Sequence, residues 1–237
     1  MDILDKLSFE QSQRLFSKER LSGYENEKEH YANFTLISLI AGRLGILEVI
    51  LRNHIHKTMC EDNALWLECL PCELNLKTSP KHTQPHELIS HQSLGFWLRV
   101  VEHYKIHNRL FDREFLDRLD FKLYFSGNKN AMGKKKLRAY QKVSIFLNLF
   151  LTLRNRAFHF ENLYKLNEQG KPRLSVFVKN GKEKIIISIE TNKIELFLDD
   201  FIVYFVEKVR VGNKDPLECG RIITQNTKYY KSKKDKE

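Results

Sequence analysis

The residues best suited to chemistry in this sequence form a cluster that ends on a histidine, Arg154-Asn155-Arg156-Ala157-Phe158-His159. The imidazole of a histidine titrates near neutral pH, so His159 can remove or supply a proton. The guanidinium of Arg154 is planar and permanently charged, which suits an anion such as a phosphate. Asn155 lies four residues before His159 and is its neighbour on a helix, where it can orient either group. These residue types predict a catalytic site made of Arg154, Asn155 and His159.

Arg154 extends the apolar face of the helix that precedes it, which carries Leu147, Phe150 and Leu151. A guanidinium on a buried face is costly unless it has a partner or a function. Five residues separate Arg154 from His159, which places them about 140° apart on an ideal helix. The two side chains can therefore meet only in a cleft between helices or between two copies of the chain. The competing interpretation is a structural arginine and a histidine whose hydrogen bonds are satisfied.

An earlier helix, expected over residues 33–59, carries a second polar strip. Its apolar residues recur every three or four positions, at Ile37, Ile40, Leu44, Leu47, Leu51 and Ile55. Beside them Glu48, Arg52 and His56 follow one another at intervals of four, on one side of the helix. One interpretation is that Arg52, Asn53 and His56 complete the site within one chain while Glu48 pairs with Arg52 or Arg154. The other is that Glu48 and Arg52 form an ion pair that only supports their helix.

Positive charge is concentrated in one part of the chain. Forty Lys and Arg residues against 30 Asp and Glu give a net charge of +10, and no acidic residue lies between Asp120 and Glu161. A basic block of this kind favours a polyanion, of which nucleic acid is the commonest. The residues that we expect to contact it are Lys129, Lys134, Lys135, Lys136, Arg138, Lys142 and Arg156. The competing interpretation of residues 129–142 is a solvated, lysine-rich loop.

The periodicity of the chain predicts a mainly α fold with one late β-hairpin followed by a further helix. Further helices are expected over residues 94–104, 112–119 and 137–164. Alternating apolar residues flank Asn180-Gly181 and predict a hairpin over residues 173–190, because Asn-Gly suits a tight type I′ turn. Asn192 and Glu195 indicate the start of a helix whose buried face carries Ile194, Phe197, Phe201 and Phe205.

The same patterns divide the chain into parts. We expect a helical lead-in over residues 1–31, a helical core over 32–166, and a hairpin plus helix packed on that core over 172–212. The core is interrupted by an irregular loop at about 70–93 and by a basic loop at about 126–136. A lysine-rich tail over 225–237 is expected to be mobile.

Composition excludes several classes of protein. An apolar share of 42% with 10 Gly and 5 Pro excludes collagen-like and wholly disordered chains. The longest apolar stretch that we find, residues 143–153, is too short for a bilayer, so no membrane association is expected. Four Cys suggest reduced thiols and a cytoplasmic protein. Cys69, Cys72, His82 and His86 have the residue types of a zinc site, but the gap between the pairs is short for a zinc finger, so an irregular loop is favoured.

Two Arg-Asn motifs carry a family resemblance. LRNRAFHFENL, from Leu153, resembles the "RN…AHHE" motif of the Abi-like (abortive infection, AbiD/AbiF-type) family, which belongs to the HEPN superfamily of RNases. LEVILRNHIHKTM, from Leu47, is similar to the earlier "LEVALRNALH" helix of that family. ERLSGYENEKEHYANFTL resembles its N-terminal lead-in and SLGFWLRVVEHY its "FW" helix, so the similarity covers residues 17–166. Phe160 stands where a second His is common, and Asn162 where Pro is common.

The resemblance implies a HEPN-like helical bundle and metal-independent cleavage of RNA, with the ribose 2′-hydroxyl as the internal nucleophile. It implies no cofactor, and Arg154, Asn155 and His159 match the motif residues of the family. It also implies a homodimer, in which two such motifs face each other, and an anti-phage or toxin–antitoxin role, in some relatives under the control of a structured non-coding RNA. The main alternative is a non-catalytic RNA-binding protein of the same fold.

Overall fold

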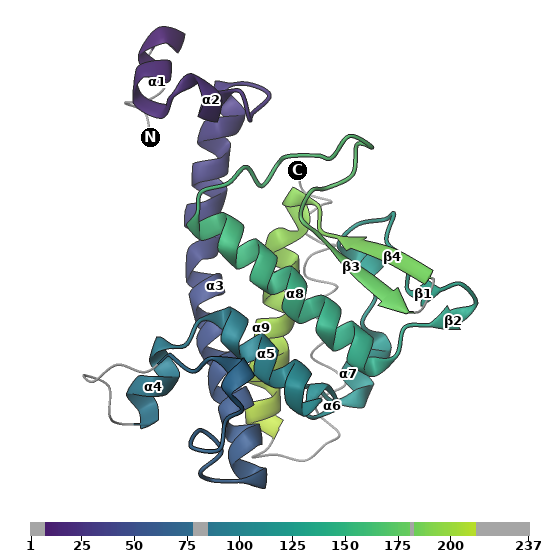
Figure 1. Ribbon diagram of the computed structural model, residues 1–237. Coiled ribbons are helices and arrows are strands. Elements are labelled where there is room, and N and C mark those ends of the chain that lie inside the picture. Colours follow the sequence, from purple (N-terminus) through teal and green to yellow (C-terminus); the bar gives the residue numbers. More distant parts are fainter. Residues whose placement is uncertain (1–7, 78–84, 181–182, 212–237) are drawn as a thin grey trace.

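The computed structural model describes residues 8–77, 85–180 and 183–211, and its architecture is mainly helical (Figure 1). The longest element is α3 (Glu27–Asp62), which includes the helix predicted over 33–59. Its apolar residues Ile40, Leu44, Leu47, Leu51 and Ile55 are completely buried. The three-and-four spacing of these residues places them on one face, and that face forms one side of the core.

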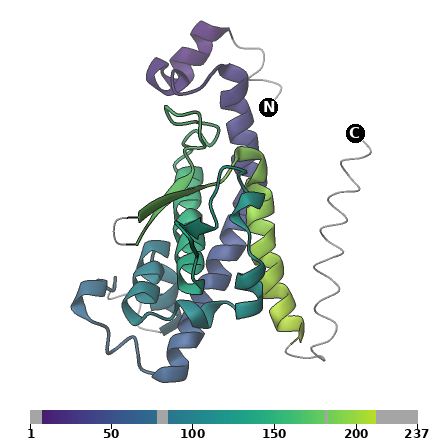
Figure 2. The ribbon, with the colours of Figure 1, turned by 90° about the vertical axis from the view of Figure 1, so that its right-hand side faces the viewer.

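Two further long helices complete the core. α8 (Ala139–Phe158) crosses in front of α9 (Ile194–Val211) and reaches α3 with its C-terminal end, and α9 runs beside α3 (Figures 1 and 2). The ring of Phe201 on α9 stacks on Phe146 of α8, with ring centroids 3.4 Å apart. The predicted apolar face of the last helix is confirmed, because Ile194, Phe197, Phe201 and Phe205 are all buried. α9 begins after a 3-10 turn, η4 (Thr191–Lys193), rather than at Asn192.

The described part of the lead-in before α3 contains two short helices. α1 (Phe9–Phe16) and α2 (Lys18–Leu21) lie at the N-terminal end of α3 (Figure 1). α3 starts at Glu27 and continues through residue 31, so the lead-in and the core share one helix. The expected boundary between residues 31 and 32 is therefore not a break in the backbone.

The middle of the chain forms short elements around one end of α3 and α8. They are η2 (Cys72–Leu74), α4 (Pro85–His91), α5 (Leu94–Tyr104), α6 (His107–Leu110), α7 (Arg113–Arg118) and η3 (Phe121–Leu123). The helix expected over 94–104 is confirmed by α5, and the one over 112–119 by α7. The irregular stretch at 70–93 contains α4, a short helix that the prolines concealed.

The described residues form two antiparallel hairpins where the sequence predicts one. The predicted hairpin is formed by β3 (Ser175–Asn180) and β4 (Glu183–Ser188), in the register Val176 to Ile187. The basic stretch predicted as a loop contains a second, smaller hairpin of β1 (Ala131–Met132) and β2 (Lys135–Lys136). Gly133 makes the turn between them with a φ of +56°, a conformation that glycine adopts without strain. The prediction for residues 225–237 lies outside the described residues.

Helix α3 is long and apolar enough to cross a membrane, with a mean hydropathy of 2.0 over its most apolar window. Arg43 and Glu48 interrupt the apolar residues of this helix, so they do not form one continuous apolar run in the sequence. The core helix of a soluble protein passes the same test. The cytoplasmic location of the protein stays a prediction.

Candidate functional site

The Arg154 side chain lies where the C-terminal half of α8 faces α3. Its Nε donates a hydrogen bond to Oε2 of Glu48 at 2.9 Å, and its guanidinium lies over the ring of Phe158 at 5.0 Å. Of the two partners that the sequence left open for Glu48, the structure shows Arg154. The Arg154 side chain remains 32% exposed, so one edge of the guanidinium is available to a ligand. Glu48 and Phe158 hold its position through a charge-assisted hydrogen bond and a cation–π contact.

Asn155 and His159 are both exposed at the end of α8. The amide oxygen of Asn155 accepts a hydrogen bond from Nη1 of Arg154 at 3.5 Å. The backbone N–H of His159 donates to the carbonyl of Asn155 at 3.0 Å, which continues the helical turn. Among the described residues, no hydrogen bond or ion pair occupies the His159 ring or joins it to Arg154. The side chains of Arg154 and His159 are both accessible to a substrate, and their spacing of five residues places them about 140° apart around the helix.

The helix ends earlier than the expected residue 164. Phe160 adopts a φ of +53°, and the backbone N–H groups of Phe160 and Glu161 donate to the carbonyls of Ala157 and Arg156. This is the Schellman motif, in which the residue after the cap is usually glycine because the left-handed conformation is unfavourable for a side chain. The motif places His159 at the cap position, where its side chain leaves the helix.

Contacts from α2 and α3 hold this turn, and no local sequence pattern predicts them. Nη2 of Arg20 donates to the carbonyl of Phe160 at 2.8 Å, while Nε of Arg20 donates to Nε2 of His30 at 3.3 Å. The ring of Phe160 packs on Phe34, with centroids 5.5 Å apart. The two contacts with Phe160 link residues about 130 to 140 positions apart, for which a local pattern carries no signal. They offset the unfavourable conformation of Phe160.

The other residues of the earlier Arg-Asn motif lie apart from Arg154. Nη1 of Arg52 donates to the carbonyl of Ser90 at 3.3 Å, and Asn53 is exposed. Nδ1 of His56 accepts a hydrogen bond from the indole of Trp66 at 3.1 Å, and burial lowers the pKa of His56. Among the described residues, neither Arg52 nor His56 contacts Arg154 or His159. The structure therefore gives no geometric support to a site completed by Arg52 and His56 within one chain.

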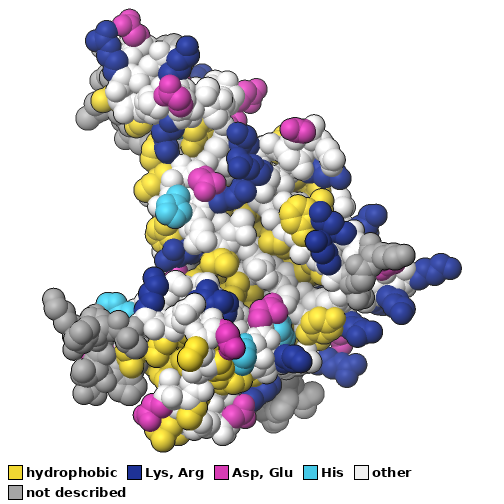
Figure 3. Space-filling view, viewed as in Figure 1, with side chains coloured by type: hydrophobic (Ala, Val, Ile, Leu, Met, Phe, Trp, Pro, Cys, Tyr) yellow, Lys and Arg dark blue, Asp and Glu magenta, His cyan; other side chains and the backbone are white. Residues whose placement is uncertain are grey.

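The lysines of the basic block lie at the opposite end of α8. Lys and Arg side chains gather over β1–β4 on the right-hand side of the space-filling view (Figure 3). Lys129, Lys134, Lys135, Lys136 and Arg138 are all exposed. Sixteen residues separate Arg138 from Arg154, which corresponds to about 24 Å along a helix. The structure does not bring the basic block and the candidate catalytic residues into one cleft.

Two of the predicted nucleic-acid contacts are committed to other groups. Nζ of Lys142 donates to the carbonyls of Leu116 and Leu119, at the end of α7. Nε of Arg156 lies 3.8 Å from Oε2 of Glu161, and burial lowers the pKa of Arg156. In this conformation Lys142 and Arg156 therefore stabilise the fold through these contacts.

The basic block is not free of acids in three dimensions. A groove of about 1090 Å³ beside β1 and β4 is lined by Lys122, Lys129, Lys136 and Lys184, but also by carboxylates. Those carboxylates belong to Asp117, Asp120 and Glu183, which flank the acid-free window in the sequence or come from another element. The local field is therefore weaker than the sequence suggests.

The residues considered for zinc do not form a cluster in the described part of the chain. Cys69 and Cys72 are exposed free thiols, and His86 is exposed on α4. His82 lies outside the described residues. Within the described ranges, no group of three or more His, Cys, Asp and Glu side chains is placed to hold a metal ion.

Comparison of the chain with family models, with curated proteins and with solved structures found no match. The class of this protein is therefore argued from its own residues and their geometry.

Proposed function

We propose that this protein is a HEPN-type ribonuclease that acts as a toxin in an abortive-infection or toxin–antitoxin system. The observation that carries the proposal is that one helix end presents two accessible groups, His159 and Arg154, which do not contact each other. His159 is accessible at the cap of α8, and Arg154 is half-exposed and held in position by Glu48. The two Arg-Asn motifs that resemble the Abi-like family supply these residues and Glu48.

The chemistry would be an internal attack by the ribose 2′-hydroxyl on the adjacent phosphate, which leaves a cyclic phosphate and a free 5′-hydroxyl. His159 would remove the proton from the 2′-hydroxyl or donate one to the leaving oxygen. Arg154 would stabilise the negative charge that builds up on the phosphate oxygens. Asn155, hydrogen-bonded to Arg154, would orient the guanidinium. This reaction requires no cofactor.

A homodimer would solve the divergence of Arg154 and His159, because each site would take one group from each copy. α3 offers a surface for this contact, since Leu39, Ile46 and Val49 are 52%, 53% and 44% exposed on one side of the helix. Asn53 continues the same side, one turn beyond Val49. An apolar stripe exposed to water favours association, and a two-fold axis would pair it with its own copy.

The proposed test expresses the wild type, His159→Ala and Arg154→Ala under tight control and compares growth and RNA integrity. We expect the wild type to be toxic and to cleave RNA in the presence of a chelator, and both variants to do neither. Cleavage that survives in His159→Ala would disprove the assignment. Loss of cleavage on chelation would indicate a metal site instead.

Mixing the two variants tests whether the site is shared between copies. A mixed dimer of His159→Ala and Arg154→Ala contains one site with both groups intact, if each site takes Arg154 from one copy and His159 from the other. We expect cleavage to return on mixing after dissociation and reassembly. No return of activity would favour a site within one chain.

A non-catalytic RNA-binding protein is the second candidate. The observation in its favour is the ion pair between Arg154 and Glu48, because a structural arginine is neutralised in the same way. Under this function the wild type would bind RNA and leave it intact. The partner in either case would be RNA in the cytoplasm, including a structured non-coding RNA that inhibits the toxin.

A further inference from the structure

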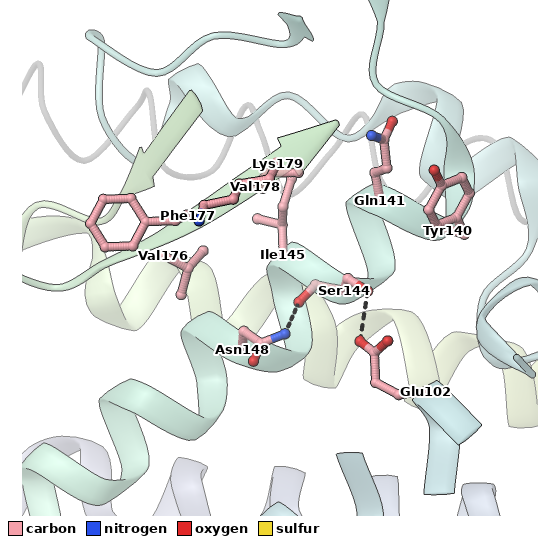
Figure 4. Close-up of a pocket in the computed structure, with 10 residues that line it drawn as sticks. All are labelled: Glu102, Tyr140, Gln141, Ser144, Ile145, Asn148, Val176, Phe177, Val178 and Lys179. Carbon is pink, nitrogen blue, oxygen red and sulfur yellow. Dashed lines mark hydrogen bonds between the residues drawn. The ribbon is translucent and has the colours of Figure 1, made fainter. Parts of the chain in front are cut away.

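A second concave site lies between β3 and the N-terminal half of α8 (Figure 4). Its volume is about 240 Å³. The polar side chains that line it belong to Glu102, Tyr140, Gln141, Ser144, Asn148 and Lys179. Its size and its mixed polar and aromatic wall suit a small planar group with hydrogen-bonding edges.

The polar groups of this pocket keep hydrogen-bonding capacity for a ligand. The hydroxyl of Ser144 donates to Oε1 of Glu102 at 3.1 Å, and Nδ2 of Asn148 donates to the carbonyl of Ser144 at 2.8 Å (Figure 4). These bonds fix the side chains and leave Oδ1 of Asn148 and the second oxygen of Glu102 as acceptors. Such groups match the amino and imino donors on the edge of an unpaired base.

The free edge of β3 forms the opposite wall. Val176, Phe177, Val178 and Lys179 all line the pocket, although alternate residues of a strand point to opposite faces. Four consecutive residues therefore border it along the strand edge. Among the described residues β3 pairs only with β4, so this edge offers backbone donors and acceptors as well.

Phe177, one of the residues that line the pocket, has an exposed aromatic ring with a lysine over it. Phe177 is 60% exposed, and Nζ of Lys184 lies 4.0 Å from the centroid of its ring. Lys179 lies opposite Lys184 in the hairpin register. A ring of this kind provides a surface on which a base stacks, while the ammonium groups attract the phosphates that flank it.

A row of uncharged polar side chains connects the pocket to the candidate catalytic histidine. The row consists of Tyr140, Ser144, Asn148, Thr152, Asn155 and His159, at intervals of four, four, four, three and four residues. All six are exposed or half-buried and share one side of α8, within an arc of about 120°. The distance along the helix from Asn148 to His159 is about 16 Å. A single strand laid on this row would pass from the pocket to His159 within a few nucleotides.

We propose that the pocket between α8 and β3 binds one unpaired nucleobase of the RNA substrate, a few nucleotides away from the phosphate at His159. The inference rests on the proposed function for the identity of its ligand. The inference requires an RNA that is single-stranded along α8, because in a duplex the base edge that would form hydrogen bonds with the pocket is already paired.

The test measures binding and not cleavage. In a His159→Ala background, fluorescence anisotropy follows three probes: a labelled hexauridine, an abasic oligomer of the same length, and a short RNA duplex. We expect hexauridine to bind more tightly than both others. Phe177→Ala should weaken its binding about 5- to 150-fold, the range for loss of one base–aromatic stack. Asn148→Ala should weaken it as well.

Matched controls separate the pocket from general effects. Val209→Ala removes a side chain that is 72% exposed on α9, and Asn192→Ala removes an exposed amide that does not line the pocket. Both should bind hexauridine like the parent, and all variants should unfold at the same temperature. Equal binding of hexauridine and the abasic oligomer, or an unchanged Phe177→Ala, would overturn the inference. Neither result depends on cleavage, so the ribonuclease assignment is tested separately.

Discussion

The two ends of α8 both carry positive charge, but they use it differently. At the C-terminal end, Arg154 and Arg156 each lie against a carboxylate, and the backbone is closed by a turn that Arg20 braces. At the N-terminal end, the lysines of the β1–β2 hairpin are exposed. The arrangement at the C-terminal end holds the guanidinium of Arg154 in one position, which suits contact with a single phosphate. The arrangement at the N-terminal end spreads charge over a surface, as long-range attraction of a polyanion requires.

This difference shows how far charge counted along a sequence can mislead. The window between Asp120 and Glu161 contains no acid, yet Glu48 from α3 neutralises Arg154 within it. Glu183 from β4 lines the groove that contains Lys129. The function of a cation depends on what the fold places beside it.

The largest expected effect comes from removing the guanidinium of Arg154 at the C-terminal end, compared with removing the lysine charges at the N-terminal end. Arg154→Ala should lower kcat for RNA cleavage about 100-fold or more and change KM little, because its guanidinium acts on charge that develops during the reaction. Changing Lys134, Lys135 and Lys136 together to Gln should raise KM and leave kcat nearly unchanged. Steady-state kinetics on a single-stranded RNA measure both. A similar loss of kcat in the two variants would remove the distinction between the two ends.

The same lysine variant sharpens the comparison through salt. Each phosphate contact with a single strand contributes about 0.7 to the slope of log K against log salt, so loss of three contacts should flatten the slope by about two units. Glu48→Gln at the other end should leave the slope almost unchanged. Affinities measured between low and moderate salt give both slopes. An unchanged slope in the lysine variant would exclude the β1–β2 hairpin from the binding surface.

Of the two ends of α8, the C-terminal end should be loosened more by acidification. Burial, and then the neighbouring Arg20, lower the pKa of His30, which accepts a hydrogen bond from Arg20 in its neutral form. Below a pH of about 6.5 the unfolded chain binds a proton that folded His30 resists, so stability falls as the pH drops. Hydrogen exchange at pH 7.5 and 5.5, corrected for intrinsic rates, should show faster opening of α1, α2 and the Phe160 turn than of β1–β2. Equal changes at both ends would contradict this prediction.

The smallest expected effect is on the free energy of unfolding, and it concerns two residues of similar backbone conformation near opposite ends of α8. Phe160 and Gly133 have φ values of +53° and +56°. Phe160→Gly should be more stable than Phe160→Ala by about 1 kcal/mol, because both lose the contact with Phe34 but only alanine keeps a Cβ in the left-handed region. Gly133→Ala should lose about 1 kcal/mol for the same reason. Urea unfolding measures all three variants, and equal stability of the two Phe160 variants would mean that the turn relaxes.

Local periodicity was sufficient to predict the long helices and the late hairpin, although not the end of α8 or the short helix α4. The spacing from Ile37 to Ile55 indicated the buried face of α3, and Asn180-Gly181 indicated where β3 and β4 are joined. The arginine that needs a partner was predicted from its position on an apolar face, and Glu48 was one of the candidates. These features depend on residues close in sequence or on a single pair of helices.

The rest depends on contacts between distant segments. The end of α8 is set by Phe160, whose left-handed conformation is held by Arg20 from the lead-in. No local pattern distinguishes this phenylalanine from one that continues a helix. The commitment of Lys142 to the carbonyls of α7 also requires the fold to be known.

The position of α9 in the core has a consequence for synthesis. Phe201 stacks on Phe146, and α9 runs beside α3 along much of its length, so a chain that ends before residue 201 lacks one side of its interior. On a ribosome, residues 139–159 would emerge well before the helix that supports them. Under the proposed function this order would be protective, because the candidate catalytic end of α8 would acquire its support only after α9 has been synthesised.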